Sequence, residues 1–261
     1  MRQIVCLKVT PKVDEIRFDD QSKTIIREGV ENEIDDADKN ALEMALHLKD
    51  KFGGTVTVIS MGPPAFEPFL KLAVAMGADD AILLSDRGFA GSDTFATSRV
   101  LAAALRKLSP FDVVYCGEAS ADGSTEQVPP SIAEWLDVPG ITYVTSLDYD
   151  GSAMKARRDI RGGYETIRAK TPILVSVELG CNTPRFPDFR RKRWAEKELK
   201  LTVWNMQDLG LLPSQAGNEG SLTTVTGLRN MRATARKNEY LTGTPEEVVS
   251  RLLQAIQEAR A

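Results

Sequence analysis

The sequence predicts an α/β fold in which a parallel sheet is covered by helices. Strand patterns alternate with helical patterns over residues 1–140, and this alternation is typical of βαβ units. The chain has 261 residues, which is enough for a full core and long for one domain. We therefore expect one main domain with an extension.

Short apolar runs mark the predicted strands, and apolar faces at helical spacing mark the helices between them. Strands are expected at Ile4–Val9, Thr55–Met61, Ala81–Leu84 and Val113–Gly117. The three helical faces are formed by Ala41, Leu42, Ala45, Leu46 and Leu48, by Phe69, Leu70, Ala73 and Val74, and by Leu101, Ala104, Leu105 and Leu108. Ser92 or Asp93 is the expected N-cap of the third helix. Pro129 and Pro130 fit a helix only in its first turn, so they predict one more helix start.

After residue 141 the predicted strands become shorter. Ser152–Arg158 and Tyr164–Lys170 flank a turn at 159–163, which predicts a hairpin, and Ile173–Leu179 is the next buried strand. The pattern then changes, because the basic run Arg190–Arg193 leads to a stretch at 213–222 that is as rich in Gly, Ser and Asn as a linker. We expect an α/β domain over residues 1–190 and an arm over residues 191–261.

The arm ends in a helix with a strong start signal. Thr244 is the expected N-cap, Pro245 the first helical residue and Glu247 the capping-box partner. An apolar stripe follows, made of Val248, Val249, Leu252, Leu253 and Ile256. The pattern predicts an arm that docks on a partner subunit, and docking back on the chain's own domain is the alternative.

Composition excludes several classes of function. A net charge of −4 gives no electrostatic footprint for nucleic acid or for an anionic membrane. The apolar run at the N-terminus is too short for a signal peptide or a membrane span, so we expect a cytoplasmic protein that does not itself cross a membrane.

Cysteine and histidine usage argues against a metal site and against nucleophilic catalysis. The three cysteines lack metal-ligand spacing, and Cys6 and Cys116 are expected to be buried in strands as small apolar side chains. With His47 as its single histidine, the chain offers no convincing Ser-His-Asp, Cys-His or zinc site. No metal ligand and no catalytic side chain is predicted.

The most informative segment is the loop from Gly117 to Val128. It follows a buried strand, contains two glycines and several hydroxyls, and precedes a helix start. Helix N-termini favour anions, glycine lets the backbone approach a ligand closely, and the hydroxyls of Ser124 and Thr125 add donors. The segment predicts a phosphate-binding site.

Four stretches carry a resemblance to a known family. They are Val5-Cys6-Leu7-Lys8, Val58-Ile59-Ser60-Met61-Gly62-Pro63-Pro64, the loop at 117–128, and Arg158-Asp159-Ile160-Arg161-Gly162-Gly163-Tyr164-Glu165. In these stretches and over nearly its whole length, the chain resembles the β subunit of electron transfer flavoproteins. The resemblance implies an adenine-nucleotide-binding, Rossmann-like domain that forms a heterodimer with an α subunit, and the α subunit holds the redox FAD.

The resemblance also implies where the cofactor lies. The adenine nucleotide of the family sits on the segments that match Cys6, residues 35–38, Met61 and the loop at 117–128, at strand ends and helix starts where open α/β sheets bind ligands. With neighbouring matched positions, the expected cofactor-binding residues are Cys6, Asp35, Asp38, Met61, Gly62, Asp93, Thr94, Thr97, Gly117, Glu118, Ala119, Ser120, Ala121, Asp122, Gly123, Ser124, Thr125, Glu126, Gln127 and Val128.

The loop sequence bears on which nucleotide is bound. Members that only carry electrons bind AMP, whereas electron-bifurcating members bind a second FAD and have loops that resemble Asp-Gly-x-Thr-x-Gln-Val-x-Pro. This chain matches the bifurcating pattern over Asp122–Pro130, and Ser92–Ser98 looks like the same group's Asp-Thr-x-Ala-Thr. Glycine at 123 in place of a carboxylate also removes bulk and negative charge near a pyrophosphate. FAD is the expected cofactor, and AMP is the alternative.

In the bifurcating branch, NADH is the implied electron donor. One electron passes to ferredoxin or flavodoxin, and the other passes through the α subunit to an acyl-CoA or 2-hydroxy-acid dehydrogenase. The loop Cys181–Phe189 matches the segment that docks the dehydrogenase, although Phe189 stands where relatives often have an aliphatic residue. An ATP-cleaving ligase on the same fold is disfavoured, because no Gly-rich pyrophosphate-cleaving loop follows the first strand.

Several charged positions keep two interpretations. The carboxylates at 35–38 replace an Asn-Pro stretch of relatives, and they either accept from the nucleotide or cap a helix. The hairpin arginines Arg157, Arg158, Arg161 and Arg168 contact a flavin or the α subunit, or they form a solvated cross-strand face. Glu165 is expected in an intersubunit ion pair, and the basic run at 190–193 is either solvated or faces an acidic partner.

Overall fold

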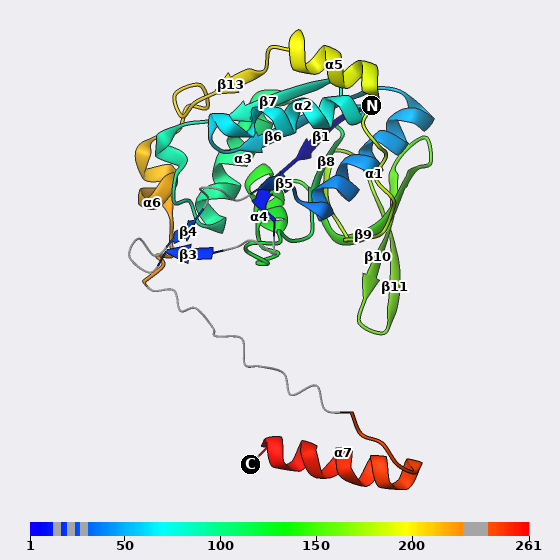
Figure 1. Cartoon of the computed structure of the whole chain (residues 1–261). Helices are drawn as coiled ribbons and strands as arrows, with labels where there is room; N and C mark the ends of the chain where they lie inside the picture. Colours follow the sequence, from blue (N-terminus) through cyan, green and yellow to red (C-terminus); the bar gives the residue numbers. More distant parts are fainter. Residues whose placement is uncertain (13–16, 20–23, 27–30, 227–239, 261) are drawn as a thin grey trace. The chain divides into compact units, whose positions relative to one another are not determined.

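A nine-stranded sheet forms the centre of the larger part of the molecule (Figure 1). The computed structural model describes residues 1–12, 17–19, 24–26, 31–226 and 240–260. The chain divides into two compact units, residues 1–227 and residues 228–261, and each is described by itself.

The sheet has the strand order β11-β10-β9-β12-β8-β1-β6-β7-β13. Its strands are β1 (Arg2–Cys6), β6 (Thr55–Met61), β7 (Asp80–Leu84), β8 (Val113–Gly117), β9 (Gly140–Tyr149), β10 (Met154–Ile160), β11 (Gly163–Ala169), β12 (Ile173–Val177) and β13 (Thr202–Trp204). The neighbours in the run β9-β12-β8-β1-β6-β7-β13 pair in parallel. Beyond β9, strands β10 and β11 extend the sheet by antiparallel pairing.

Helices and short ribbons complete the first unit. The helices of the chain are α1 (Asp36–Phe52), α2 (Glu67–Met76), α3 (Thr94–Leu108), α4 (Val128–Leu136), α5 (Phe189–Lys197), α6 (Gly217–Gly220) and α7 (Pro245–Arg260), with 3-10 turns η2 (Pro64–Phe66), η3 (Arg87–Phe89) and η4 (Pro213–Gln215). Two small ribbons pair β2 (Val9–Pro11) with β5 (Asn32–Ile34) and β3 (Arg17–Asp19) with β4 (Thr24–Ile26).

Helices cover both faces of the sheet, as the alternation of βαβ units predicts. Along β1, Val5 points into a core shared with α1 and α2, whereas Ile4 and Cys6 point into a second core shared with α3 and α4. All three side chains are at most 6% exposed. The unit is therefore an α/β/α sandwich, and the predicted fold class is confirmed.

The local predictions hold for most elements. The four early strands, the hairpin and the strand after Pro172 form where the apolar runs predict them, with ends that differ by at most three residues. Asp93 caps α3 by accepting from the Ala96 N–H at 2.9 Å, and Pro129 and Pro130 lie in the first turn of α4. Cys6 and Cys116 are buried, as expected.

The first unit extends beyond the boundary predicted at residue 190. Arg191 of α5 donates to the backbone carbonyls of Val74 (3.1 Å) and Ala78 (2.6 Å), so its charge lies at the C-terminal end of α2, where the helix dipole favours cations. Strand β13 then pairs in parallel with β7. Both contacts join segments more than 100 residues apart, and local patterns do not encode such pairings.

The second unit contains α7, which begins as predicted. Thr244 N–H donates to the Glu247 carboxylate at 3.0 Å, and Glu247 N–H donates to the Thr244 hydroxyl at 3.4 Å, which is the reciprocal capping box. The apolar stripe of α7 is exposed within the described residues; its large members are Val249, Leu252, Leu253 and Ile256.

The strand order places a switch point between β1 and β8. From β1 the chain proceeds through α1 to β6 on one side, and later through α3 to β8 on the other side. The two connections leave a crevice outside the carboxyl ends of these strands, and open α/β sheets bind their ligands there.

Candidate functional site

A cleft of about 450 Å³ opens at the carboxyl ends of β1 and β8. Its volume lies within the range of small-molecule sites. Of the residues predicted from the sequence, it is lined by Cys6, Asp38, Met61, Asp93, Thr94, Thr97, Gly117, Glu118, Ala119, Ser120, Asp122, Gly123, Thr125, Glu126 and Val128. The structure thus brings together segments from five separate parts of the chain.

The remaining predicted residues do not line the cleft; they are Asp35, Gly62, Ala121, Ser124 and Gln127. Asp35 accepts from backbone amides, Ser124 hydroxyl donates back to the Ser120 carbonyl at 3.2 Å, and Gln127 accepts from the Thr94 hydroxyl at 3.2 Å. Gly62 is packed so closely under the Phe66 ring that a Cβ would lie 2.2 Å from a ring carbon. These positions support the residues that line the cleft and do not line it themselves.

Lys8 is the main functional residue that the predicted set lacks. Its ammonium donates to the Ser120 hydroxyl at 2.9 Å and forms an ion pair with Asp122. Although burial opposes the shift, the hydrogen bond and the charge of Lys8 lower the pKa of Asp122. The pair holds a cation at the cleft without leaving Asp122 as a bare negative charge. A lysine directly after the first strand, at its carboxyl end, is the sequence signal for this position.

Asp38 and Asp35 hold the floor of the cleft together. Asp38 accepts from the Lys8 N–H at 2.6 Å and from the Gly117 N–H at 2.7 Å, so one carboxylate joins the ends of β1 and β8 to α1. Asp35 caps α1 through the Ala37 N–H at 3.1 Å and accepts from the Ala121 N–H at 2.7 Å. Of the two interpretations, helix capping accounts for Asp35.

Burial raises the pKa of both carboxyl groups. For Asp35 burial outweighs the two N–H donors, and for Asp38 burial and the neighbouring Asp35 raise the pKa to about 7. Asp38 is 7% exposed, so its charge interacts with the cleft and is little screened by solvent.

The loop between β8 and α4 presents backbone donors and strained residues. Ser124 (φ 45°) and Glu126 (φ 58°) occupy the left-handed region, which costs a non-glycine residue about 1–3 kcal/mol and is typical of functional sites. Within the described chain, the N–H groups of Ala119, Ser120 and Thr125 have no acceptor. They are therefore available to oxygen atoms of a ligand.

Helix α4 contributes fewer donors than its position suggests. Pro129 and Pro130 carry no N–H, and Ser131 N–H donates to the Gln127 carbonyl at 3.1 Å. The loop amides and the start of α3 present polar groups to the cleft in its place. Thr94 and Thr97, in the first turns of α3, line the cleft with their hydroxyl-bearing side chains.

Both carboxylate oxygens of Asp93 accept hydrogen bonds from groups of the chain itself. One carboxylate oxygen caps α3, and the other accepts from Leu222 N–H, Thr223 N–H and the Thr223 hydroxyl, each at 2.9 Å. These donors lower the pKa of Asp93 despite its burial. The segment predicted as a linker is thereby fixed beside the cleft.

Part of the cleft lining is apolar. Phe66, Phe89 and Leu101 belong to it with Met61, and none of these three belongs to the predicted set. A lining that combines apolar side chains with hydroxyls, amides and one ammonium suits a nucleotide, which has a flat base at one end and anionic phosphate at the other. The residues present therefore fit such a ligand.

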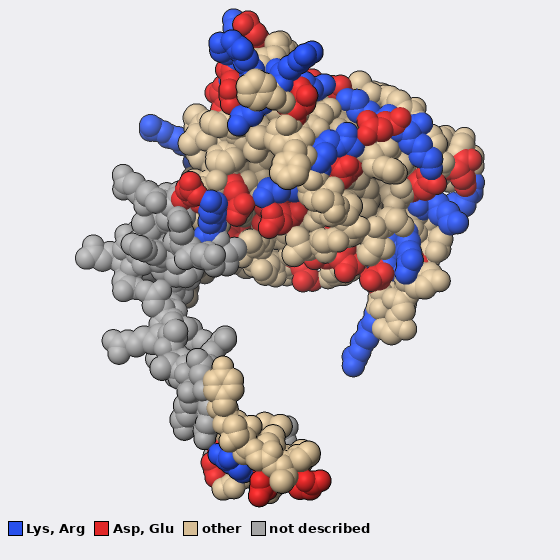
Figure 2. All heavy atoms as spheres, turned by 45° about the vertical axis from the view of Figure 1, so that its right-hand side comes forward, with Lys and Arg blue, Asp and Glu red and all other residues tan. Residues whose placement is uncertain are grey.

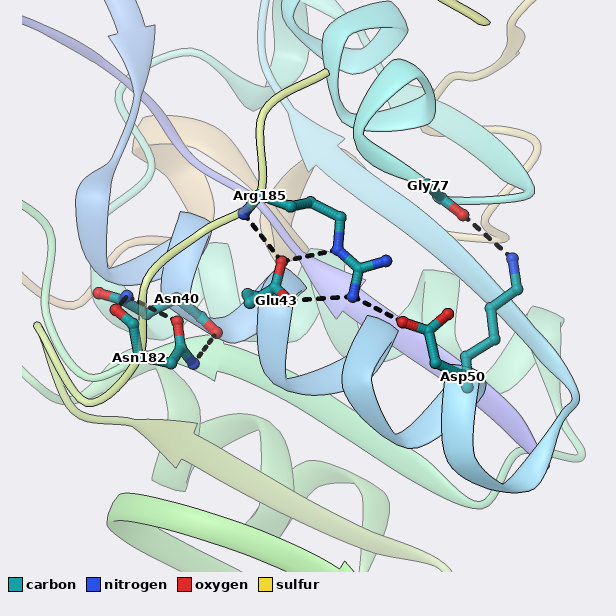
Figure 3. Close-up of polar contacts among 7 residues, drawn as sticks. Asn40, Glu43, Asp50, Gly77, Asn182 and Arg185 are labelled. Carbon is teal, nitrogen blue, oxygen red and sulfur yellow. Dashed lines mark hydrogen bonds and ion pairs between the residues drawn. The ribbon is translucent and has the colours of Figure 1, made fainter. Parts of the chain in front are cut away.

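The loop predicted to dock a dehydrogenase is anchored to α1 (Figure 3). Arg185 binds Glu43 with two hydrogen bonds of 2.9 Å and also reaches Asp50 at 2.8 Å. The anchored loop leaves Phe186 94% exposed and Phe189 77% exposed. Large apolar side chains held in solvent by a rigid base are typical of interaction sites.

Three of the four hairpin arginines have partners within the chain. Arg168 pairs with Asp150 at 2.7 Å, Arg157 lies 3.9 Å from the Tyr164 ring centre, and Arg158 faces Glu165 at 4.0 Å. These contacts favour the solvated cross-strand interpretation. The intersubunit ion pair expected for Glu165 stays a prediction, and within the chain its carboxylate lies 4.0 Å from Arg158.

Charges of both signs are interspersed on the face shown in Figure 2, consistent with the small net charge. No helix among the described residues is long and apolar enough to span a membrane.

Comparison with known proteins identifies the family. The electron transfer flavoprotein domain matches residues 22–208. The chain is 41% identical over 256 residues to the electron transfer flavoprotein subunit beta of Thermoanaerobacterium thermosaccharolyticum, covering 98% of both chains. It is 45% identical over 226 residues to the corresponding subunit of Clostridium acetobutylicum, covering 86% of both. It is also 39% identical over 261 residues to the caffeyl-CoA reductase-Etf complex subunit CarD of Acetobacterium woodii, covering 99% of this chain and 98% of CarD.

The fold and the cleft define an α/β protein with a ligand-sized crevice at its switch point. The chain belongs to the electron transfer flavoprotein family and within it to the β subunits. Membership implies a flavoprotein subunit that works with an α subunit.

Proposed function

We propose that this chain is the β subunit of an electron-bifurcating electron transfer flavoprotein and that its cleft binds FAD. The proposal rests above all on the loop at 117–128, which lines the switch-point cleft with a lysine-neutralised carboxylate and a glycine at 123. Bound FAD would supply the redox chemistry, accepting a hydride from NADH and passing on single electrons. The protein supplies binding, orientation and electrostatics.

The residues divide the binding between them. Lys8, the loop amides and the hydroxyls of Thr94, Thr97 and Thr125 would hold the pyrophosphate and ribose, because they are the donors on the cleft lining. Phe66 and Phe89 would pack against a ring of the cofactor. Asp38 would act from behind, by fixing the Lys8 and Gly117 amides at the mouth of the switch point.

Gly123 supports FAD over AMP. A Cβ at this position would lie 3.3 Å from the Ser120 hydroxyl oxygen and 3.9 Å from the Lys8 nitrogen. A longer side chain would therefore extend beside the one cation of the cleft lining among the described residues. Glycine leaves this space to the ligand, and a carboxylate would compete for Lys8.

The surfaces outside the cleft support the proposed partners. The exposed stripe of α7 would dock on the α subunit, since an amphipathic helix must bury its apolar face. The loop Cys181–Phe189 would receive a flavin-dependent dehydrogenase. The name of one relative, a subunit of a caffeyl-CoA reductase complex, supports an acyl-CoA enzyme in this role, with a 2-hydroxy-acid dehydrogenase as the other class. Ferredoxin or flavodoxin would take the low-potential electron.

Cofactor content of the purified αβ complex tests the proposal. Two FAD per heterodimer, with NADH oxidation that requires both a ferredoxin or flavodoxin and a dehydrogenase acceptor, is the expected result. One FAD and one AMP would overturn it and leave an electron carrier with a structural nucleotide. Acid release followed by chromatography distinguishes the two nucleotides directly.

A further inference from the structure

Cys6 and Cys116 lie side by side at the floor of the cleft. Strands β1 and β8 pair in parallel with Val5 opposite Tyr115, so the next residue of each strand is a cysteine on the opposite face. Both cysteines belong to the same core cluster, and both line the cleft. Neighbouring strands are about 4.8 Å apart, which is within the Cα separation that a disulfide spans.

The two thiols also contact each other. The hydrogen bond that Cys116 donates to Cys6, burial, and the negative charge of Asp38 raise the pKa of Cys116 well above its usual value. Cys6 is 6% exposed and Cys116 is 4% exposed. Access to the pair is therefore by way of the cleft. The third cysteine, Cys181, begins the proposed docking loop Cys181–Phe189 and is partly exposed.

We propose that Cys6 and Cys116 are a dithiol modification site, which a peroxide oxidises to a disulfide when the cleft is empty and which a bound nucleotide shields. The shielding rests on the proposed function, whereas the dithiol itself rests only on strand register and contact. The dithiol lies within the nucleotide cleft, of which Cys6 is an expected contact, and its chemistry belongs to the two sulfur atoms at the floor.

The oxidation balances with hydrogen peroxide as the oxidant. One cysteine releases its proton, its thiolate attacks a peroxide oxygen and the O–O bond breaks, so that a sulfenic acid forms and the leaving hydroxide takes up the proton as water. The sulfur of the second cysteine then attacks the sulfenic sulfur, the S–O bond breaks, and a second water leaves as the S–S bond forms. Two thiols and one peroxide give one disulfide and two waters. Because the pKa of Cys116 is raised, the rate should increase as pH rises above neutral.

Peptide mapping of the full chain in complex with its α subunit tests the site. The complex, stripped of its exchangeable nucleotide, is treated with hydrogen peroxide and digested without reduction. A peptide pair linked through Cys6 and Cys116 is expected. With FAD or AMP added at about ten times its Kd, linkage should slow about tenfold, because only the empty fraction reacts. If both cysteines stay reduced while Cys181 is fully oxidised, the inference is overturned.

The outcomes separate this inference from the proposed function. Linkage at the same rate with and without nucleotide would keep the dithiol and overturn the shielding, together with the placement of the nucleotide above it. Cys6→Ser and Cys116→Ser should each abolish the linked peptide, and Cys181→Ser should leave it intact. Phenylarsine oxide gives a second measurement on the unaltered chain, because trivalent arsenic binds two adjacent thiols with release of water. Phenylarsine oxide added to the stripped complex before peroxide should therefore prevent formation of the linked peptide. Full linkage in its presence would count against the pair.

Discussion

The side-chain amides of Asn40 and Asn182 each donate hydrogen bonds to the other residue. Asn40 donates to the backbone carbonyl of Asn182 at 2.8 Å and to its side-chain oxygen at 2.9 Å, and Asn182 donates to the Asn40 carbonyl at 2.9 Å. The Asn40 oxygen also accepts from the Gly180 N–H at 2.9 Å. A single residue of α1, only 3% exposed, thus fixes the start of the docking loop (Figure 3).

Asn40→Ala should lower the free energy of unfolding by about 1–3 kcal/mol, because it leaves Gly180 and Asn182 with unpaired polar groups. Urea unfolding measures the loss, and hydrogen exchange at the Gly180 amide should become faster. Asn218→Ala is the control, since this exposed asparagine should change stability by no more than about 0.5 kcal/mol. Equal losses from the two variants would contradict the anchoring role.

Phe186→Ala should weaken dehydrogenase binding by about tenfold or more while leaving stability nearly unchanged. The side chain is 94% exposed, so its removal costs the fold little, whereas aromatic anchors dominate binding energies at interfaces. Titration of the αβ complex with the dehydrogenase measures the affinity. Leu212→Ala removes another exposed apolar side chain outside the loop and should bind as the unaltered chain does. An unchanged affinity for Phe186→Ala would move the docking site elsewhere.

Gly123→Asp should empty the cleft without unfolding the chain. The new carboxylate would compete with phosphate for Lys8, and a like charge at about 4 Å costs a few kcal/mol near a protein surface, so FAD affinity should fall about tenfold to a hundredfold. Flavin content of the complex measures the effect, and the flavin of the α subunit should stay. Gly163→Asp is matched in charge, and a Cβ there meets nothing within 4 Å. Loss of both flavins, or of neither, would show that the site is misplaced.

Asp38 should make stability fall as pH rises from about 4 to about 7. Its pKa is raised to about 7 in the fold, whereas the unfolded chain releases the proton near pH 3.9, so the folded state holds more protons over that interval. The contribution lost is at most about 4 kcal/mol. Asp38→Asn does not titrate, so the stability advantage of the unaltered chain over this variant should shrink with rising pH. Urea unfolding of both proteins across this range would show a constant gap if Asp38 does not titrate there.

Leu252→Glu should release the α subunit. The residue lies in the exposed stripe of α7, and burying a leucine at an interface contributes about 1.5–3 kcal/mol, which the glutamate would forfeit. Sedimentation of the co-purified complex should show dissociation at concentrations where the unaltered complex is intact. Gln254→Glu adds the same charge outside the stripe, so it should leave the complex whole. Release by both variants would indicate a charge effect and no apolar docking.

The sheet and its covering helices could be predicted because their information is local. The apolar runs of the strands, the apolar faces of the helices and caps such as Asp93 and Thr244 all lie within single segments of the sequence. Strand β13 escaped prediction, because its short run gains its place only through pairing with β7. Arg191 likewise looked like one charge of a solvated run, and its role depends on the carbonyls of α2.

The candidate site was predictable where the loop sequence carries it. The resemblance led to the segments, but it did not distinguish residues that line the cleft from those that support it. Asp35 and Gln127 face backbone and side-chain partners from distant segments, so only the three-dimensional arrangement shows their role. The lining residues Phe66 and Phe89 were missed for a related reason, since an aromatic in a short turn has no periodic signal.

Helix α1 carries both the floor of the cleft and the base of the docking loop. Asp35 and Asp38 bind the first, and Asn40, Glu43 and Asp50 bind the second. Thermodynamic linkage is symmetric for any two ligands that share one structural element. By whatever factor a filled cleft changes the affinity of the loop for its dehydrogenase, the bound dehydrogenase must change the affinity of the cleft for its nucleotide by the same factor.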